Sequence, residues 1–162
     1  MVRHSPAAVL SLFCFVAAVG AEEAPPLPEE LLGEWVVVAA EYRGERPSAE
    51  IVAKLAKFPV VVEGDKLPLP PLSYRDDSGF FIDAGGPLAV RCRAKTSAAP
   101  KEIELVLQDG NVEFRMLGIY AVEGKRLQLC WQHDGRGRPK EFRTTKEPSQ
   151  MMFVLERAAK GS

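Results

Sequence analysis

The chain has 162 residues, of which 46% are hydrophobic and 27% charged, a composition typical of one soluble globular domain. Lysine and arginine number 21 against 22 aspartates and glutamates, so the formal net charge at pH 7 is -1. Proteins that bind the nucleic-acid backbone usually carry a strong basic excess, so we expect no nucleic-acid partner. Only two histidines occur, His4 and His133, which leaves little for a histidine-based metal site or catalytic triad.

The first 21 residues have the features of a secretory signal peptide. A basic start, an apolar run at residues 7–19 and small residues at its end indicate cleavage after Ala21. The run is shorter than the roughly 20 residues that a transmembrane helix needs, so we expect no membrane span. Cys14 follows Phe13 instead of a small residue, which argues against a lipid anchor. We therefore predict an exported protein, either periplasmic or extracellular.

A proline-rich segment follows at residues 22–30. Pro25, Pro26 and Pro28 disfavour a helix or an interior strand, so this segment is predicted to be an extended spacer. The folded domain is expected at residues 31–157, with a flexible tail at 158–162.

Within the domain, short apolar runs alternate with turn sequences that contain glycine and aspartate. We predict ten strands, at residues 34–42, 59–63, 66–69, 74–83, 88–95, 102–108, 112–122, 126–132, 141–145 and 151–157. A short helix is predicted after the first strand, at residues 48–57, where Ser48 can cap it. A meander of this length leaves exposed edges unless it closes. The fold class is therefore all-β, an antiparallel up-and-down barrel of 8–10 strands.

The period-two pattern of the strands predicts which side chains face the barrel interior. The inward set comprises Ile103, Leu105, Leu107, Leu127, Leu129, Trp131, Met151, Phe153, Leu155 and Arg157. Two alternatives stay open at this point, because a barrel of this size is either filled by its own side chains or holds one small apolar ligand.

Ordered motifs along residues 32–157 connect the chain to a family. Leu32-Gly33-Glu34-Trp35 contains the Gly-x-Trp signature of the first lipocalin strand, and Leu155-Glu156-Arg157 contains an arginine at the position of its closing arginine. The other motifs are Glu41-Tyr42-x-Gly44, Pro100-Lys101-x-Ile103, Gly118-Ile119-Tyr120 with Gly124, Leu127-x-Leu129-Cys130 and Arg138-Pro139-x-x-Phe142. The set resembles lipocalin-like domains that recur in planctomycete bacteria. The chain departs from that pattern at residues 94–97, where the family tends to have an Asp-Pro pair, and at Cys92. The resemblance implies a lipocalin-like barrel, and because the family has no agreed activity it implies no function.

Catalytic and cofactor motifs are not evident, so we predict neither an enzyme nor a bound cofactor or metal. The Gly135-x-Gly137 pair lacks the third glycine of a dinucleotide site. Aspartates 76, 77 and 83 are expected in turns, where their side chains bond to their own backbone. His133 is expected to be an exposed loop residue without the partners that zinc requires.

The predicted function is binding of a small apolar or amphipathic ligand inside the barrel. The candidate ligand-binding residues are Ile103, Leu105, Ile119, Leu129, Trp131, Arg138, Phe142 and Phe153. Arg138 is expected at the barrel mouth, where it binds a carboxylate of the protein or, less favoured, of the ligand.

The alternative function is that of an envelope interaction module whose barrel core is filled. Its candidate surface is the basic segment at residues 136–146, which fits an anionic partner, although a solvated hairpin would have the same composition. The basic side chains of that segment are Arg136, Arg138, Lys140, Arg143 and Lys146. We expect a monomer in either case.

Cys92 and Cys130 are predicted to be free thiols, even though exported proteins usually form disulfides. Alternation places Cys92 inside the barrel and Cys130 outside. Two further strands separate theirs, which puts the α-carbons beyond the roughly 7 Å that a disulfide can bridge.

Three residues are predicted to have structural roles at one end of the barrel. These are Gly33, Trp35 and Arg157. Closure of the meander brings the first and last strands together, so Trp35 and Arg157 should both point inward, with the guanidinium stacked on the indole and hydrogen-bonded to loop carbonyls.

Overall fold

The structure is a computed structural model that describes residues 25–159, so the predicted signal peptide at 1–21 and the end of the tail at 160–162 lie outside it. Its single helix within these residues is α1 (Ala49–Leu55). The strands are β1 (Gly33–Tyr42), β2 (Val60–Val62), β3 (Lys66–Leu69), β4 (Leu72–Arg75), β5 (Gly79–Ile82), β6 (Leu88–Lys95), β7 (Lys101–Asp109), β8 (Val112–Glu123), β9 (Arg126–Gln132) and β10 (Gln150–Arg157).

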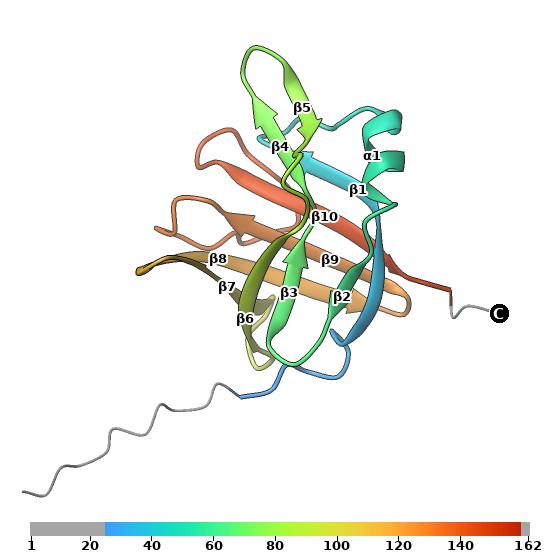
Figure 1. Cartoon of the computed structure of the whole chain (residues 1–162). Coiled ribbons are helices and arrows are strands. Elements are labelled where there is room, and N and C mark those ends of the chain that lie inside the picture. The colour runs from blue at the N-terminus through green and yellow to red at the C-terminus, as the bar shows by residue number, and fades with distance from the viewer. Residues whose placement is uncertain (1–24, 160–162) are drawn as a thin grey trace, which may run out of the picture.

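Eight strands form one antiparallel sheet in the order β2-β1-β10-β9-β8-β7-β6-β3. Figure 1 shows that this sheet curves until its edge strands β2 and β3 lie side by side. Two backbone hydrogen bonds between Glu63 and Lys66, of 3.2 and 2.9 Å, join these edges at the turn between them. The sheet is therefore nearly closed, and the predicted all-β, lipocalin-like barrel is confirmed.

The predicted helix after the first strand is also present. The Ser48 hydroxyl accepts a hydrogen bond of 3.4 Å from the Ile51 amide, as expected of an N-cap residue. Leu55 at the other end of the helix is fully buried. The helix lies beside β1 at the same end of the barrel as the β4–β5 hairpin (Figure 1).

Two of the predicted strands differ from the structure. The segment predicted as one strand at residues 74–83 belongs to a hairpin of two strands, β4 and β5, because Gly79, the first residue of β5, has a positive φ of 71° that interrupts an extended strand. Residues 141–145 form no strand, because β9 pairs directly with β10 and leaves no edge for them. Thr144 is instead held by the Glu41 carboxylate of β1, which accepts from its amide at 3.1 Å and its hydroxyl at 2.8 Å.

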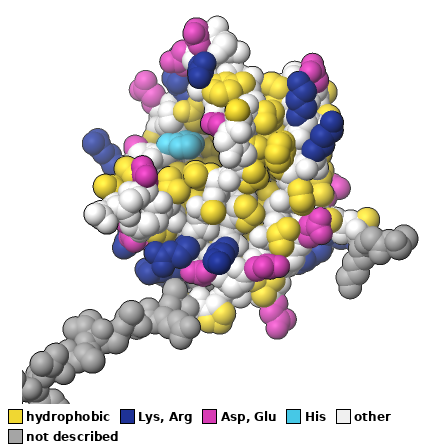
Figure 2. Space-filling model, viewed as in Figure 1, with side chains coloured by type: hydrophobic (Ala, Val, Ile, Leu, Met, Phe, Trp, Pro, Cys, Tyr) yellow, Lys and Arg dark blue, Asp and Glu magenta, His cyan; other side chains and the backbone are white. Residues whose placement is uncertain are grey.

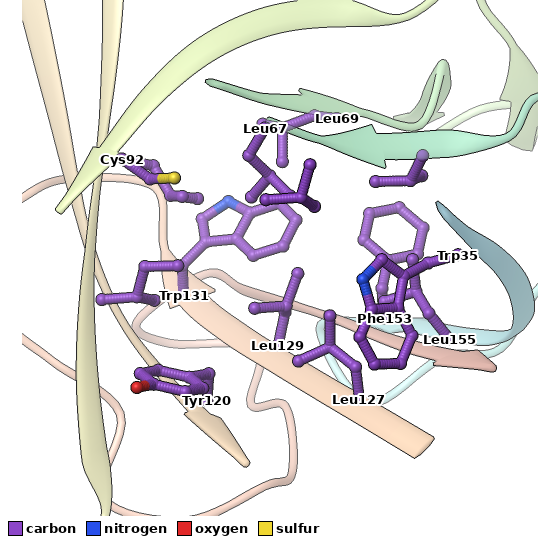
Figure 3. Packing of buried hydrophobic residues seen from close by; sticks show 14 of the residues in the cluster. Trp35, Leu67, Leu69, Cys92, Tyr120, Leu127, Leu129, Trp131, Phe153 and Leu155 are labelled. Carbon is purple, nitrogen blue, oxygen red and sulfur yellow. The ribbon is translucent and has the colours of Figure 1, made fainter. Parts of the chain in front are cut away.

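The interior of the barrel is packed with large apolar side chains, shown in Figure 3. Trp35, Tyr120 and Phe153 are the largest of the fully buried ones. The inward positions predicted by alternation on β7, β9 and β10 all belong to this cluster or pack against it, except Arg157, which is described below. Burial of each large apolar side chain stabilises the fold by about 1.5–3 kcal/mol.

A second, smaller apolar cluster lies on the outer face of the sheet. It consists of Ile119, Cys130 and Met152, with Phe142 packed against them. Phe142 belongs to the loop at residues 133–149, which crosses the outside of β8, β9 and β10. This covering explains why residues 150–155 of β10 are buried on both faces.

The end of the barrel at the start of β1 is closed as predicted. Trp35 pairs with Arg157 in the register of β1 and β10, and the Arg157 guanidinium carbon lies 4.3 Å from the centre of the indole ring. The guanidinium donates hydrogen bonds of 2.8 Å to the carbonyls of Leu32 and Glu30. Gly33 has a φ of 115°, and a Cβ at this position would lie 2.8 Å from the guanidinium. The backbone therefore needs glycine here.

Part of the predicted spacer packs against this closed end. Leu27 is buried in the main cluster, and Glu30 forms an ion pair of 2.7 Å with Lys101 at the start of β7. Residues 27–30 therefore contribute to the closed end of the barrel.

Both described cysteines are free thiols, as predicted. Cys92 lies inside the barrel, while Cys130 lies on the outer face, where the loop at 133–149 covers it. Burial raises the pKa of each thiol to about 12.

These thiols are expected to be unreactive in the folded protein at pH 8, because they are buried and protonated. The measurement is titration with an aromatic disulfide reagent in a Cys14→Ser background, before and after denaturation without reductant. We expect both cysteines to react only after denaturation. A failure of either to react in the denatured chain would contradict the strand order and register described above.

Candidate functional site

A cavity of about 400 Å³ lies at the end of the barrel remote from the Trp35–Arg157 contact. Its lining residues come from the ends of β3, β7 and β9, from the starts of β4, β6 and β10, and from β8. Apolar side chains form its floor, namely Leu107, Met116, Trp131, Met151 and Phe153. The barrel is thus filled at one end and hollow at the other.

The hairpin β4–β5 and the segments beside it form the wall of the cavity mouth. Residues 69–73, 83 and 85–88 line the opening. The hairpin is held by aromatic contacts, because the Tyr74 ring lies 5.2 Å from that of Tyr42 and 5.1 Å from that of Phe80. An ion pair of 3.0 Å between Arg43 and Asp76 adds a further contact with β1 and its turn.

Two polar side chains at the mouth are fixed by local contacts. Asp83 accepts hydrogen bonds from the Gly85 amide at 2.9 Å and from the Ser73 hydroxyl at 3.4 Å, the turn role expected of an aspartate at this position. The His133 ring contacts Tyr42 edge-on at 5.6 Å, and the surrounding groups lower its pKa by partly desolvating it. Figure 2 shows apolar side chains gathered around this histidine on the surface.

The predicted ligand-binding residues separate into three groups. Trp131 and Phe153 line the cavity, and their ring centres are 5.6 Å apart. Ile103, Leu105 and Leu129 lie inside the barrel but belong to the packed core and are not among the cavity-lining residues. Figure 3 shows Leu129 in this core.

The remaining three, Ile119, Phe142 and Arg138, lie outside the barrel, and the structure corrects their placement. Ile119 points outward because it alternates with the inward residues Gly118 and Tyr120. Phe142 packs on the same outer surface from the loop at 133–149, which does not continue the sheet.

Arg138 also crosses the outer surface, instead of lying at the barrel mouth. It donates hydrogen bonds to the carbonyls of Ile103, at 2.9 Å, and of Gly118. Its other terminal nitrogen lies 3.5 Å from the Glu102 carboxylate. The partner of Arg138 is therefore a protein carboxylate, the favoured of the two alternatives, and the arginine fastens the loop to β7 and β8.

The basic segment at 136–146 lines a second, shallower pocket of about 290 Å³ on the outer surface. Arg138 is engaged as described, and Arg143 forms an ion pair of 2.7 Å with Glu141. Glu147 also lines this pocket. These carboxylates reduce the positive charge that an anionic partner would meet.

Several residues of the main cavity were not on the sequence-based list of ligand-binding residues. Met116 and Met151 belong to no sequence motif that indicates a binding site. Asp83 lies in a sequence that is typical of an ordinary turn. His133 could have been found, because it follows Leu129 and Trp131 at a spacing of two and therefore continues their inward face.

Comparison of the chain with protein-family models, with curated proteins and with solved structures found no match. Among residues 25–159 no helix is long and apolar enough to cross a bilayer. The same residues contain no group of three or more histidine, cysteine, aspartate or glutamate side chains that could hold a metal ion.

Proposed function

We propose that this chain is an exported, monomeric, non-enzymatic, lipocalin-like barrel that binds one small apolar or amphipathic ligand. The observation that supports this function is the cavity, which combines an apolar floor with a polar mouth. Small-molecule sites in proteins typically have about 300–1,000 Å³, a mostly apolar lining and a few fixed polar groups. The proposal of export rests on the N-terminal sequence, and the proposed kinship with the planctomycete domains rests on the motifs at residues 32–157.

The size of the cavity favours a short ligand. About 400 Å³ corresponds to on the order of a dozen water-sized groups, since each takes about 30 Å³. The packed core around Leu105 and Leu129 prevents deeper entry. An unbranched chain of roughly ten carbons therefore fits better than a large ring system.

The alternative, an envelope interaction module that uses the basic segment, has less support. It requires a filled barrel core, whereas this barrel is hollow at one end. Two of the five basic side chains of that segment, Arg138 and Arg143, are also paired with carboxylates, which lowers the positive charge that the segment presents.

Filling the cavity is expected to abolish binding of a neutral apolar dye. Leu107 is partly buried in the cavity floor, and Leu107→Trp would place an indole in the space that the dye occupies. Titration with Nile red, followed by its fluorescence, should show at least a tenfold loss of affinity for this variant.

The matched control is Val38→Trp, which adds the same side chain at an exposed position of β1. It should bind the dye as the wild type does, and thermal unfolding should show that both variants are folded. Equal affinity of the Leu107→Trp variant and the wild type would contradict the proposed function. As an independent measurement, native mass spectrometry of protein purified without denaturation would identify any ligand that is retained.

A further inference from the structure

The polar groups at the cavity mouth suggest which head group an amphipathic ligand carries. Ser73, Asp83 and His133 bring hydrogen-bonding side chains to the lining. A hydroxyl both donates and accepts, a neutral imidazole does the same, and a carboxylate only accepts. The charged member of this set is thus an acceptor.

Asp83 is held in place at the junction between β5 and the barrel. Its amide donates a 2.8 Å hydrogen bond to the Pro71 carbonyl, which ties the two sides of the hairpin together. One carboxylate oxygen accepts from the Gly85 amide, and the other lies 3.4 Å from the Ser73 hydroxyl. Each oxygen has room for a second donor, because a carboxylate oxygen has two acceptor positions.

The electrostatic character of the mouth follows from this arrangement. Asp83 supplies a carboxylate to the mouth, and partial desolvation lowers the pKa of His133, which disfavours a compensating positive charge on the imidazole. Arg43, a cation near the hairpin, is paired with Asp76, which does not line the cavity. A ligand entering the cavity therefore meets a negative charge at the mouth.

We propose that the cavity selects amphiphiles with a hydroxyl or ammonium head group over those with a carboxylate, and that Asp83 is the recognising residue. The inference rests on the proposed function and specifies its ligand class. A hydroxyl or ammonium group donates to the carboxylate oxygens, whereas a ligand carboxylate is repelled by them. The apolar tail then lies on Trp131, Phe153 and Met116.

The test compares three ten-carbon ligands that differ only in the head group. Decanol, decylamine and decanoate compete with Nile red at pH 7.5 and low ionic strength. Decanol and decylamine are expected to bind at least fivefold more tightly than decanoate. Decanoate that binds as tightly as decanol would overturn this inference alone, and the failure of all three ligands to bind would overturn the proposed function as well.

The Asp83→Asn variant tests the residue itself. Asparagine keeps an oxygen for the Gly85 amide but removes the charge, so decanoate should bind about fivefold more tightly and decylamine about fivefold more weakly. Asp77→Asn, in the turn between β4 and β5, is the matched control and should change neither affinity, since Asp77 does not line the cavity. Unchanged affinities in a folded Asp83→Asn variant would overturn the assignment.

A second measurement uses the wild type and so does not depend on the folding of a variant. The affinity for decylamine should fall severalfold between 20 and 500 mM salt, while that for decanol should not, because salt screens the attraction between exposed charges. Equal salt dependence of the two ligands would count against a charged recognition group.

Discussion

Arg157→Ala is expected to lower the free energy of unfolding by about 1–3 kcal/mol. The guanidinium covers the Trp35 indole at 4.3 Å and donates to two carbonyls of the segment that precedes β1. The stacked contact alone contributes about 0.5–2 kcal/mol, depending on desolvation. Loss of the side chain also leaves the carbonyls of Glu30 and Leu32 without this donor. Chemical denaturation followed by tryptophan fluorescence measures the change.

Two further variants interpret this loss: Arg157→Lys separates stacking from charge, and Arg126→Ala is the control. Arg157→Lys should recover only part of the lost stability, because an ammonium group cannot stack as a plane or bridge two carbonyls as a fork does. Arg126→Ala, an exposed position that pairs with Glu156 at the same end of the sheet, should lie within about 0.5 kcal/mol of the wild type. If Arg157→Ala also lies within that margin, the junction of the first and last strands contributes little to stability.

Alternation of apolar residues was sufficient to predict most of this barrel. The strands that carry it alternate cleanly, as Leu127, Leu129 and Trp131 do on β9, since each has one face in the core. The predicted contact between Trp35 and Arg157 followed from closure of the meander and is confirmed. Local pattern and closure together therefore determine the chain path.

The sequence-based predictions were wrong where tertiary contacts, and not the local pattern of apolar residues, determine the structure. Residues 141–145 have a strand-like composition, but Thr144 bonds to a side chain of β1 instead of a neighbouring strand. Ile119 and Phe142 are apolar and were therefore assigned to the interior, whereas they form an outer cluster that only the path of the loop at 133–149 creates.

The cavity could not be predicted for a related reason. Its volume depends on where the β4–β5 hairpin lies over the mouth and on how far Trp131 and Phe153 extend below it. Both follow from packing between segments that are far apart in the sequence. The sequence therefore left both a filled and a hollow barrel open, and the structure has a barrel that is filled at one end only.

Gly118→Ala is expected to destabilise the protein by about 1–3 kcal/mol. A Cβ at this position of β8 would lie 2.7 Å from the Cys130 carbonyl oxygen and 3.0 Å from the Trp131 Cβ. Both atoms belong to the paired strand β9, so they cannot move without disturbing the ladder. Alanine usually stabilises a strand by about 0.5–1 kcal/mol relative to glycine, and this steric conflict should outweigh that gain.

The same substitution should also weaken ligand binding, because displacement of Trp131 alters the floor of the cavity. Denaturant unfolding gives the stability, and Nile red titration of the folded variant gives the affinity. Gly137→Ala is the control, because the nearest atom to its added Cβ, at 3.2 Å, is the terminal amide nitrogen of the Gln132 side chain and not a backbone atom of a paired strand. A Gly118→Ala variant as stable as the wild type would show that β8 and β9 lie farther apart than described. Normal affinity in a destabilised variant would instead show that the ligand does not contact Trp131.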